Sequence, residues 1–235
     1  DEAVASYHKA LAIKPDFAEA HSNVGIVLNL LGHFTEAKAA FDQGFRISHG
    51  GPWWNASTFS DGGAGTTPVT GGMFTSTFKL RDTIDQLEYL IAKGRIDPSF
   101  QRLADRYRVV LGEIQLTEEH KSVTKLTPDQ LEHIGSFYNR MIHYAEAPRT
   151  DAGTINGSLD FKQIEDRYCS SSVSVTILDD FLKPEVLHGL RDFCLESTIF
   201  FSPVGNHYVS SSPSNGLNCD LLYQMVEELK ERFPR

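Results

Sequence analysis

The sequence lacks any apolar run approaching the ~20 residues that a membrane-spanning helix needs. Its opening, DEAVASYHKA, has none of the successive regions of a secretory signal peptide. An initiator methionine is also missing, although the first residues already follow a helical pattern. We therefore expect a cytoplasmic fragment with no membrane partner, whose missing N-terminus leaves room for a lost targeting segment.

Basic residues are too few to make a strongly cationic surface. The chain has 22 Lys and Arg against 31 Asp and Glu, a net charge of -9. Nucleic acids and anionic membranes attract clustered cations, so we expect neither as the main partner. Cysteine is scarce as well, and Cys169, Cys194 and Cys219 have no CxxC spacing. We expect buried or half-buried thiols and no zinc or redox centre.

Motifs for catalysis are absent. The chain contains no Gly-x-Ser-x-Gly, the sequence of a serine nucleophile elbow. Each of its 9 His lacks an Asp or Glu two positions later, the spacing that begins many iron sites with two His and one carboxylate. The glycines near Gly63 are not followed by Gly-Lys-Ser or Gly-Lys-Thr, so a phosphate-binding loop is not expected either. We predict no catalytic residue and no metal ligand in this chain.

An internal repeat is present at the N-terminus. Small and aromatic residues recur after 34 positions: Glu2, Ala3, Ala5, Tyr7, Leu11 and Ile13 reappear as Glu36, Ala37, Ala39, Phe41, Phe45 and Ile47. This period and these residue types resemble the tetratricopeptide repeat (TPR). One complete copy spans 18–51, and half a copy ends at Pro15. Since such arrays need about three units to be stable, we expect further repeats upstream.

Within the complete copy, two amphipathic helices are expected. Their buried faces combine small and bulky residues: His21, Val24, Gly25 and Leu28 on the first, and Ala37, Phe41, Gly44 and Phe45 on the second. The glycine and alanine allow a close approach that the Phe41 ring fills. Gly32 suits the turn between the helices.

The TPR resemblance implies a concave face that holds a protein or peptide. The matching positions on the first helix are Glu19, Ser22, Asn23, Ile26, Asn29 and Leu30. Asn23 is the best candidate because a side-chain amide can bond the backbone of an extended peptide, although a solvent-facing role is an equal alternative. Ser22 and Ile26 stand where repeats of the carboxylate-clamp type carry Lys and Asn, which argues against a chaperone-tail clamp.

A connector rich in Gly, Ser and Thr follows at 52–77, and a helical bridge is predicted over 78–148. We interpret Trp53 and Trp54 as a cap on the end of the repeats. The first bridge helix should end at Gly94, the second begins at the Asp97 cap, and the third runs from the Thr127 capping box as far as Met141.

The last segment, 149–235, begins with polar turns. At 173–178, VSVTIL alternates as a half-buried strand does, and Pro184 then suits the first turn of a helix. A short strand is predicted at 199–201 and a last helix at 219–233. The wording VSVTILDDFLKPEVLHGLRDFCLEST resembles the lead-in to the double-stranded β-helix of prolyl-hydroxylase-like oxygenases that use 2-oxoglutarate and Fe(II). The stretch FKLRDTIDQLEYLIAKGRIDPSF, 78–100, resembles the segment between repeats and oxygenase domain in bacterial-type proteins.

We therefore predict a mainly α chain: the end of a TPR solenoid, a helical bridge, and a small, incomplete α+β piece leading into a β-helix that is absent. The resemblance implies Fe(II) and 2-oxoglutarate for a complete parent enzyme, while this fragment would bind neither and be inactive. The alternative is a non-catalytic TPR adaptor or scaffold. In both cases the expected partner is a protein or peptide.

Overall fold

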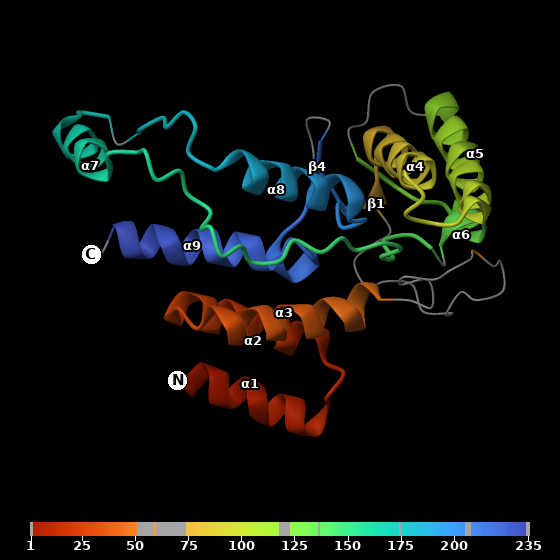
Figure 1. Cartoon of the computed structure of the whole chain (residues 1–235). Helices are drawn as coiled ribbons and strands as arrows, with labels where there is room; N and C mark the ends of the chain where they lie inside the picture. Colours follow the sequence, from red (N-terminus) through yellow and green to blue (C-terminus); the bar gives the residue numbers. More distant parts are fainter. Residues whose placement is uncertain are drawn as a thin grey trace. The chain divides into compact units, whose positions relative to one another are not determined.

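The computed structural model describes the residues 2–50, 59, 74–117, 123–135, 137–173, 175–204 and 208–233. Most of them lie in α-helices (Figure 1). The described strands form two small two-stranded sheets. The chain divides into two compact units, one of Asp1–Ala145 with Leu195–Asn218 and one of Glu146–Cys194 with Cys219–Arg235. The mainly helical fold predicted from the sequence is confirmed, whereas a solenoid is not established.

The first unit begins with three helices that share the repeat pattern. They are α1 (Glu2–Ile13), α2 (Ala18–Leu31) and α3 (Phe34–His49). Gly32 ends α2 in the left-handed conformation at φ 82°, and its N–H bonds back to Asn29. A Cβ at Gly25 would meet Phe41, and one at Gly44 would meet Ala18 and Ser22, so α2 and α3 pack closely and antiparallel. The helices predicted for the complete repeat are present.

The rest of the first unit is a helical body with its own core. Its elements are β1 (Phe74–Thr75), α4 (Thr77–Ala92), the 3₁₀ turn η1 (Pro98–Phe100), α5 (Gln101–Thr117), β2 (Thr124–Lys125) and α6 (Pro128–Ile134). The caps form as predicted: Asp97 accepts from Ser99 N at 2.8 Å, and Thr127 and Gln130 make a reciprocal capping box. The core joins these helices through Leu80, Leu87, Leu90, Phe100, Leu103, Tyr107 and Ile134.

One residue of the connector is described. Phe59 is buried, with its ring centroid 5.5 Å from Phe100 and 5.0 Å from Phe137, so this part of the connector belongs to the helical core. The predicted role of Trp53 and Trp54 lies outside the described residues.

The third bridge helix is shorter than predicted. It ends at Ile134, not at Met141. Asn139 has φ 56°, which no α-helix accommodates, and Met141 N donates to His49 O at 2.9 Å instead of to a carbonyl of its own helix. A long-range hydrogen bond therefore replaces the last helical turn.

The first unit is completed by a hairpin of β3 (Ser202–Val204) and β4 (Tyr208–Ser210), which pair antiparallel. The strand predicted at 199–201 is displaced, since β3 begins at Ser202. The 3₁₀ turn η2 (Pro213–Asn215) follows, and Asn218 Nδ2 then donates to Asp42 Oδ1 on α3 at 2.7 Å.

The second unit contains α7 (Phe161–Ser170), most of α8 (Pro184–Glu196) and α9 (Asp220–Arg232). The predicted helices after Pro184 and Cys219 are confirmed, whereas α7 was not predicted. The Glu228 carboxylate on α9 accepts from Thr154 N at 2.9 Å and Ile155 N at 3.1 Å. This contact fixes the loop before α7 to the last helix.

The strand predicted at 173–178 is wrong. The described residues there have no ladder partner, and Val173, Val175 and Ile177 are 60%, 66% and 81% exposed. A strand requires a neighbour to pair its backbone groups, and alternation alone does not supply one. Within the described residues this unit has only the isolated bridge between Ile155 and Leu182, so the expected α+β character is not found there. None of the described helices combines the length and apolar character that crossing a membrane requires.

Candidate peptide-binding surface and a buried lysine cavity

Four of the six residues suggested for partner binding share one face of α2. Glu19, Asn23, Ile26 and Leu30 follow one another at helical spacing, and we call them the α2 stripe. Ile26 is 46% and Leu30 80% exposed, Glu19 is exposed, and Asn23 is half-buried. The stripe therefore offers a carboxylate, an amide and two apolar side chains.

The other two residues lie at the edge of this face. Ser22 Oγ is 2.9 Å from the position of a Cβ on Gly44, so Ser22 faces α3 in the helix crossing. Asn29 is exposed and lies seven positions further on, on the same side of the helix as Ser22. The six positions therefore do not form one uniform surface: four make up the α2 stripe, and Ser22 and Asn29 lie at its edge.

The α2 stripe is held on a rigid support. Behind it, Ala20 and Val24 are 2% and 3% exposed, and the Phe41 ring fills the space beside Gly25. His21 Nε2 bonds Pro15 O at 2.9 Å, which ties the turn before α2 to the helix. A ligand would therefore meet a preformed surface.

Residues 1–32 match the family model of the TPR repeat. Neither a curated protein nor a solved structure matches the chain. The match covers α1, α2 and the turn between them, and it agrees with the 34-residue period. TPR repeats serve protein–protein interaction through the faces of their stacked helices, and this is the role that the match suggests for the N-terminal segment.

The iron chemistry implied by the oxygenase resemblance finds no ligands in the described part of the chain. Three or more His, Cys, Asp or Glu residues close enough to hold a metal ion do not occur there. His143, for example, uses Nδ1 to bond the backbone oxygen of Glu196 at 2.7 Å. The described residues therefore do not fit an iron site.

The cysteines do not form a site either. Cys194 is half-buried and Cys219 buried, as expected, and burial raises the pKa of both thiols. Cys169 is exposed on α7, so the expectation of a buried thiol was wrong for this residue.

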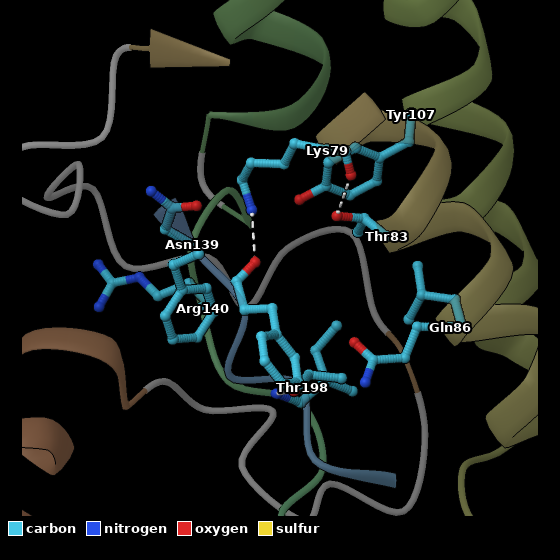
Figure 2. A pocket seen from close by; sticks show the side chains of 11 residues that line it. Lys79, Thr83, Gln86, Tyr107, Asn139, Arg140 and Thr198 are labelled. Atoms are coloured by element: carbon cyan, nitrogen blue, oxygen red, sulfur yellow. Dashed lines mark hydrogen bonds between the residues drawn. The ribbon is translucent and has the colours of Figure 1, made fainter. Parts of the chain in front are cut away.

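A cavity beside the N-terminal half of α4 holds a buried lysine that sequence reasoning missed (Figure 2). Lys79 is 3% exposed, and its ammonium donates to Phe200 O at 3.3 Å. The rings of Tyr138 and Phe201 lie 5.2 and 5.7 Å from Nζ. Burial lowers the pKa of Lys79 to about 8, and Asp82, one turn along α4, opposes this shift.

His49 lies close to the same cavity, at the end of α3. Its ring stacks on Phe201 with centroids 4.4 Å apart and planes 8° apart. Nδ1 bonds Asn139 O at 2.8 Å. Burial lowers the pKa of His49, and the positive charges of Arg140 and Lys79 lower it further. The α3 terminus and the segment around Asn139 are therefore joined through a histidine whose pKa folding lowers.

One signal in the sequence could have located this cavity. Lys79, Thr83 and Gln86 fall at helical spacing beside the apolar face of α4. The same side of the helix also carries Leu90, which is buried, so this side does not face solvent. A lysine at such a position is unusual, because lysine is almost never fully buried. Its partners, however, come from distant segments, which local periodicity does not connect.

Proposed function

We propose that the TPR repeat binds an extended segment of a partner protein along the α2 stripe, and that this chain acts as a protein-binding adaptor. The observation that carries the proposal is the exposure of Ile26 and Leu30 on the same face as Asn23 and Glu19. Exposed apolar residues beside polar ones are typical of interaction surfaces.

The dimensions of the stripe suit a short peptide. Glu19 and Leu30 are 11 positions apart, which corresponds to about 16 Å along a helix. An extended peptide covers that distance with about five residues. The peptide class follows from the chemistry: apolar side chains against Ile26 and Leu30, a backbone amide against Asn23, and a Lys or Arg near Glu19.

The proposal is tested by selecting short peptides from a displayed random library against the full chain. The affinity of the enriched peptides is then measured by fluorescence anisotropy. We expect enrichment of sequences that combine apolar residues with one basic residue. Leu30→Ser and Asn23→Ala should each weaken binding about tenfold, the size of a moderate interface residue.

Ile13→Ser is the matched control. Ile13 is an equally large apolar residue, 87% exposed, but it lies on α1. We expect it to bind the selected peptides as the wild-type chain does. Equal losses in Leu30→Ser and Ile13→Ser would show that the α2 stripe is not the binding surface.

The larger hypothesis, a parent oxygenase that uses Fe(II) and 2-oxoglutarate, rests on the resemblance at 173–198 and 78–100. Within 173–198 the structure has the helix α8 expected after Pro184, but the described residues before it form no strand. The prediction is tested by assaying a longer form of the protein for 2-oxoglutarate decarboxylation that depends on Fe(II). Decarboxylation would show that the α2 stripe belongs to an oxygenase. No decarboxylation by a longer form with a complete β-helix would contradict the hypothesis of an enzyme.

A further inference from the structure

The cavity beside α4 is positively charged. Its lining includes Lys79 and Arg140, and no carboxylate occurs among the described residues that form it. The volume is about 30 Å³, more than the ~10–15 Å³ that one water molecule requires. Thr83, Gln86 and Asn139 in the lining are half-buried, so the cavity reaches the surface. Such a site favours a small anion that can enter from solvent.

The Lys79 ammonium has unused hydrogen-bonding capacity. It carries three N–H donors, and among the described residues its one hydrogen-bond acceptor is Phe200 O, at 3.3 Å. No carboxylate of the described residues lies within 4.0 Å of Nζ. Asp82, one turn along α4, compensates this charge only from beyond that distance. A buried charge that no carboxylate contacts is costly, so the amine is an open position for a negatively charged oxygen.

In the described part of the chain, Asn139 has an acceptor atom without a donor, whereas Lys79 has donors without acceptors. Its Oδ1 atom is buried and has no hydrogen-bond donor among the described residues. The backbone beneath it is fixed, because Asn139 O accepts the His49 bond and the residue is held at φ 56°. A buried acceptor without a donor destabilises the fold unless a ligand or water supplies an O–H or N–H.

In Figure 2 the Lys79 side chain reaches from α4 toward the segment that carries Asn139 and Arg140. We propose that this cavity binds a small oxyanion that retains a hydroxyl group, with hydrogencarbonate as the best match in size and charge. Lys79 Nζ donates to the charged oxygen, and the hydroxyl of the anion donates to Asn139 Oδ1. The Arg140 guanidinium adds attraction, while its own NH1 stays bonded to Gly50 O at 2.9 Å.

The proposal separates two anions of almost the same shape. Hydrogencarbonate and nitrate are both planar and carry one negative charge, but nitrate has no proton to donate. We therefore titrate the full chain with sodium hydrogencarbonate or sodium nitrate at one near-neutral pH and equal ionic strength. Binding is followed by NMR chemical shifts of the amides near Asn139 and Thr198. We expect hydrogencarbonate to bind at least about tenfold more tightly, the difference expected for one hydrogen bond to a charged ligand.

Two variants assign the contacts. Asn139→Gly removes the acceptor and tolerates the positive φ, so it should reduce hydrogencarbonate affinity to that of nitrate. Lys79→Met should abolish binding of both anions. The Asn139→Gly comparison tests the same site if Lys79→Met does not fold.

Four results would overturn the proposal. Equal shifts with both anions in the wild-type chain would indicate an ionic-strength effect. Shifts that persist in Lys79→Met would place the anion elsewhere. An absence of shifts with either anion would mean that the cavity holds water only. Hydrogenphosphate and sulfate form a tetrahedral pair, and tighter binding of hydrogenphosphate than of hydrogencarbonate would refute the planar match.

Discussion

The ring of Phe41 occupies the space that a side chain at Gly25 would need. A Cβ built on Gly25 comes within 2.7 Å of Phe41 Cδ1 and 2.8 Å of Cε1. Phe41 is 2% exposed, so its ring is enclosed by neighbouring residues. The contact sets the distance between α2 and α3, and with it the support of the α2 stripe.

Gly25→Ala is therefore expected to destabilise the helical hairpin. Overpacking in a filled core costs about 1–3 kcal/mol, which exceeds the gain of about 1 kcal/mol from a better helix former. Thermal unfolding followed by circular dichroism should show a lower midpoint for the variant than for the wild-type chain.

Gly112→Ala provides the matched control. Gly112 lies within α5, and a Cβ there would meet nothing within 4 Å. This variant should raise stability by up to about 1 kcal/mol through helix propensity alone. A Gly25→Ala variant that gained stability as Gly112→Ala does would contradict the close approach.

Much of the first unit could be predicted because its signals are local. The spacing of Gly25, Ala37 and Phe41 predicts a closely packed helix pair. The helix caps at Asp97 and Thr127 each depend on residues only a few positions apart. Helix starts depend on hydrogen bonds between residues two or three positions apart. Sequence reasoning is reliable for contacts of that range.

The failures involve contacts between distant segments. The apolar pattern continues through Tyr138 to Met141, but Met141 N bonds His49 O, 92 positions earlier. At 173–178 the alternation is that of a strand, yet pattern alone does not say whether a partner strand exists. The lysine cavity was missed for the same reason, since Lys79, Asn139 and Phe200 come from three separate parts of the chain.

Lys79 should lower the stability of the protein at neutral pH in the absence of a bound anion. Its pKa is about 8 in the folded chain against 10.5 in the unfolded chain, so the unfolded chain binds more protons between these values. Stability should therefore rise as the pH increases from about 8 to 10.5. The shift corresponds to about 3 kcal/mol, part of which the ring contacts already offset.

We expect Lys79→Met to be more stable than the wild-type chain by about 1 kcal/mol near neutral pH, because an apolar side chain of similar length avoids burying a charge. The difference should shrink as the pH rises through the stated window. Urea unfolding at several pH values measures both effects. Lys125→Met, at an exposed position on β2, should match the wild-type chain. A Lys79→Met variant with an unchanged pH profile would argue against a buried ammonium.

His49 should make the first unit sensitive to mild acid. Its folded pKa lies below 6.5, so the unfolded chain binds more protons as the pH falls below that value. The stability that the neutral ring provides is fully present above pH 6.5, and it is lost as the pH falls toward the pKa of His49 in the folded chain. Protonation would place a second positive charge beside Arg140 and Lys79.

His49→Phe tests this effect, since a phenyl ring retains the stacking on Phe201 but does not titrate. The variant loses the bond to Asn139 O, so we expect it to be less stable than the wild-type chain at neutral pH by about 1 kcal/mol. Its stability should then change less than that of the wild-type chain on mild acidification, measured by urea midpoints. His8→Phe, at an exposed position on α1, is the control and should keep the wild-type pH dependence.

The Glu228 carboxylate should be the main polar anchor of the second unit. It accepts hydrogen bonds from Thr154 N, Thr154 Oγ1, Ile155 N and Gln224 Nε2, between 2.8 and 3.1 Å. Burial alone would raise the pKa of Glu228, but these donors together hold it below the usual value. A carboxylate whose pKa is lower in the folded chain than in the unfolded chain stabilises the fold. This stability is present above about pH 4.5 and is lost as the pH falls through the pKa of the folded chain.

Glu228→Gln should release the loop at Thr154, because an amide offers one acceptor oxygen and turns two donors toward backbone N–H groups. The expected loss is about 1–3 kcal/mol, the range for hydrogen bonds to a charged group. Hydrogen exchange of the Thr154 and Ile155 amides reports it directly, and both should lose protection in the variant at neutral pH. Glu231→Gln, exposed on the same helix, should leave that protection unchanged. If the two amides stayed protected in Glu228→Gln, the loop would be held by the bridge between Ile155 and Leu182 and not by the carboxylate.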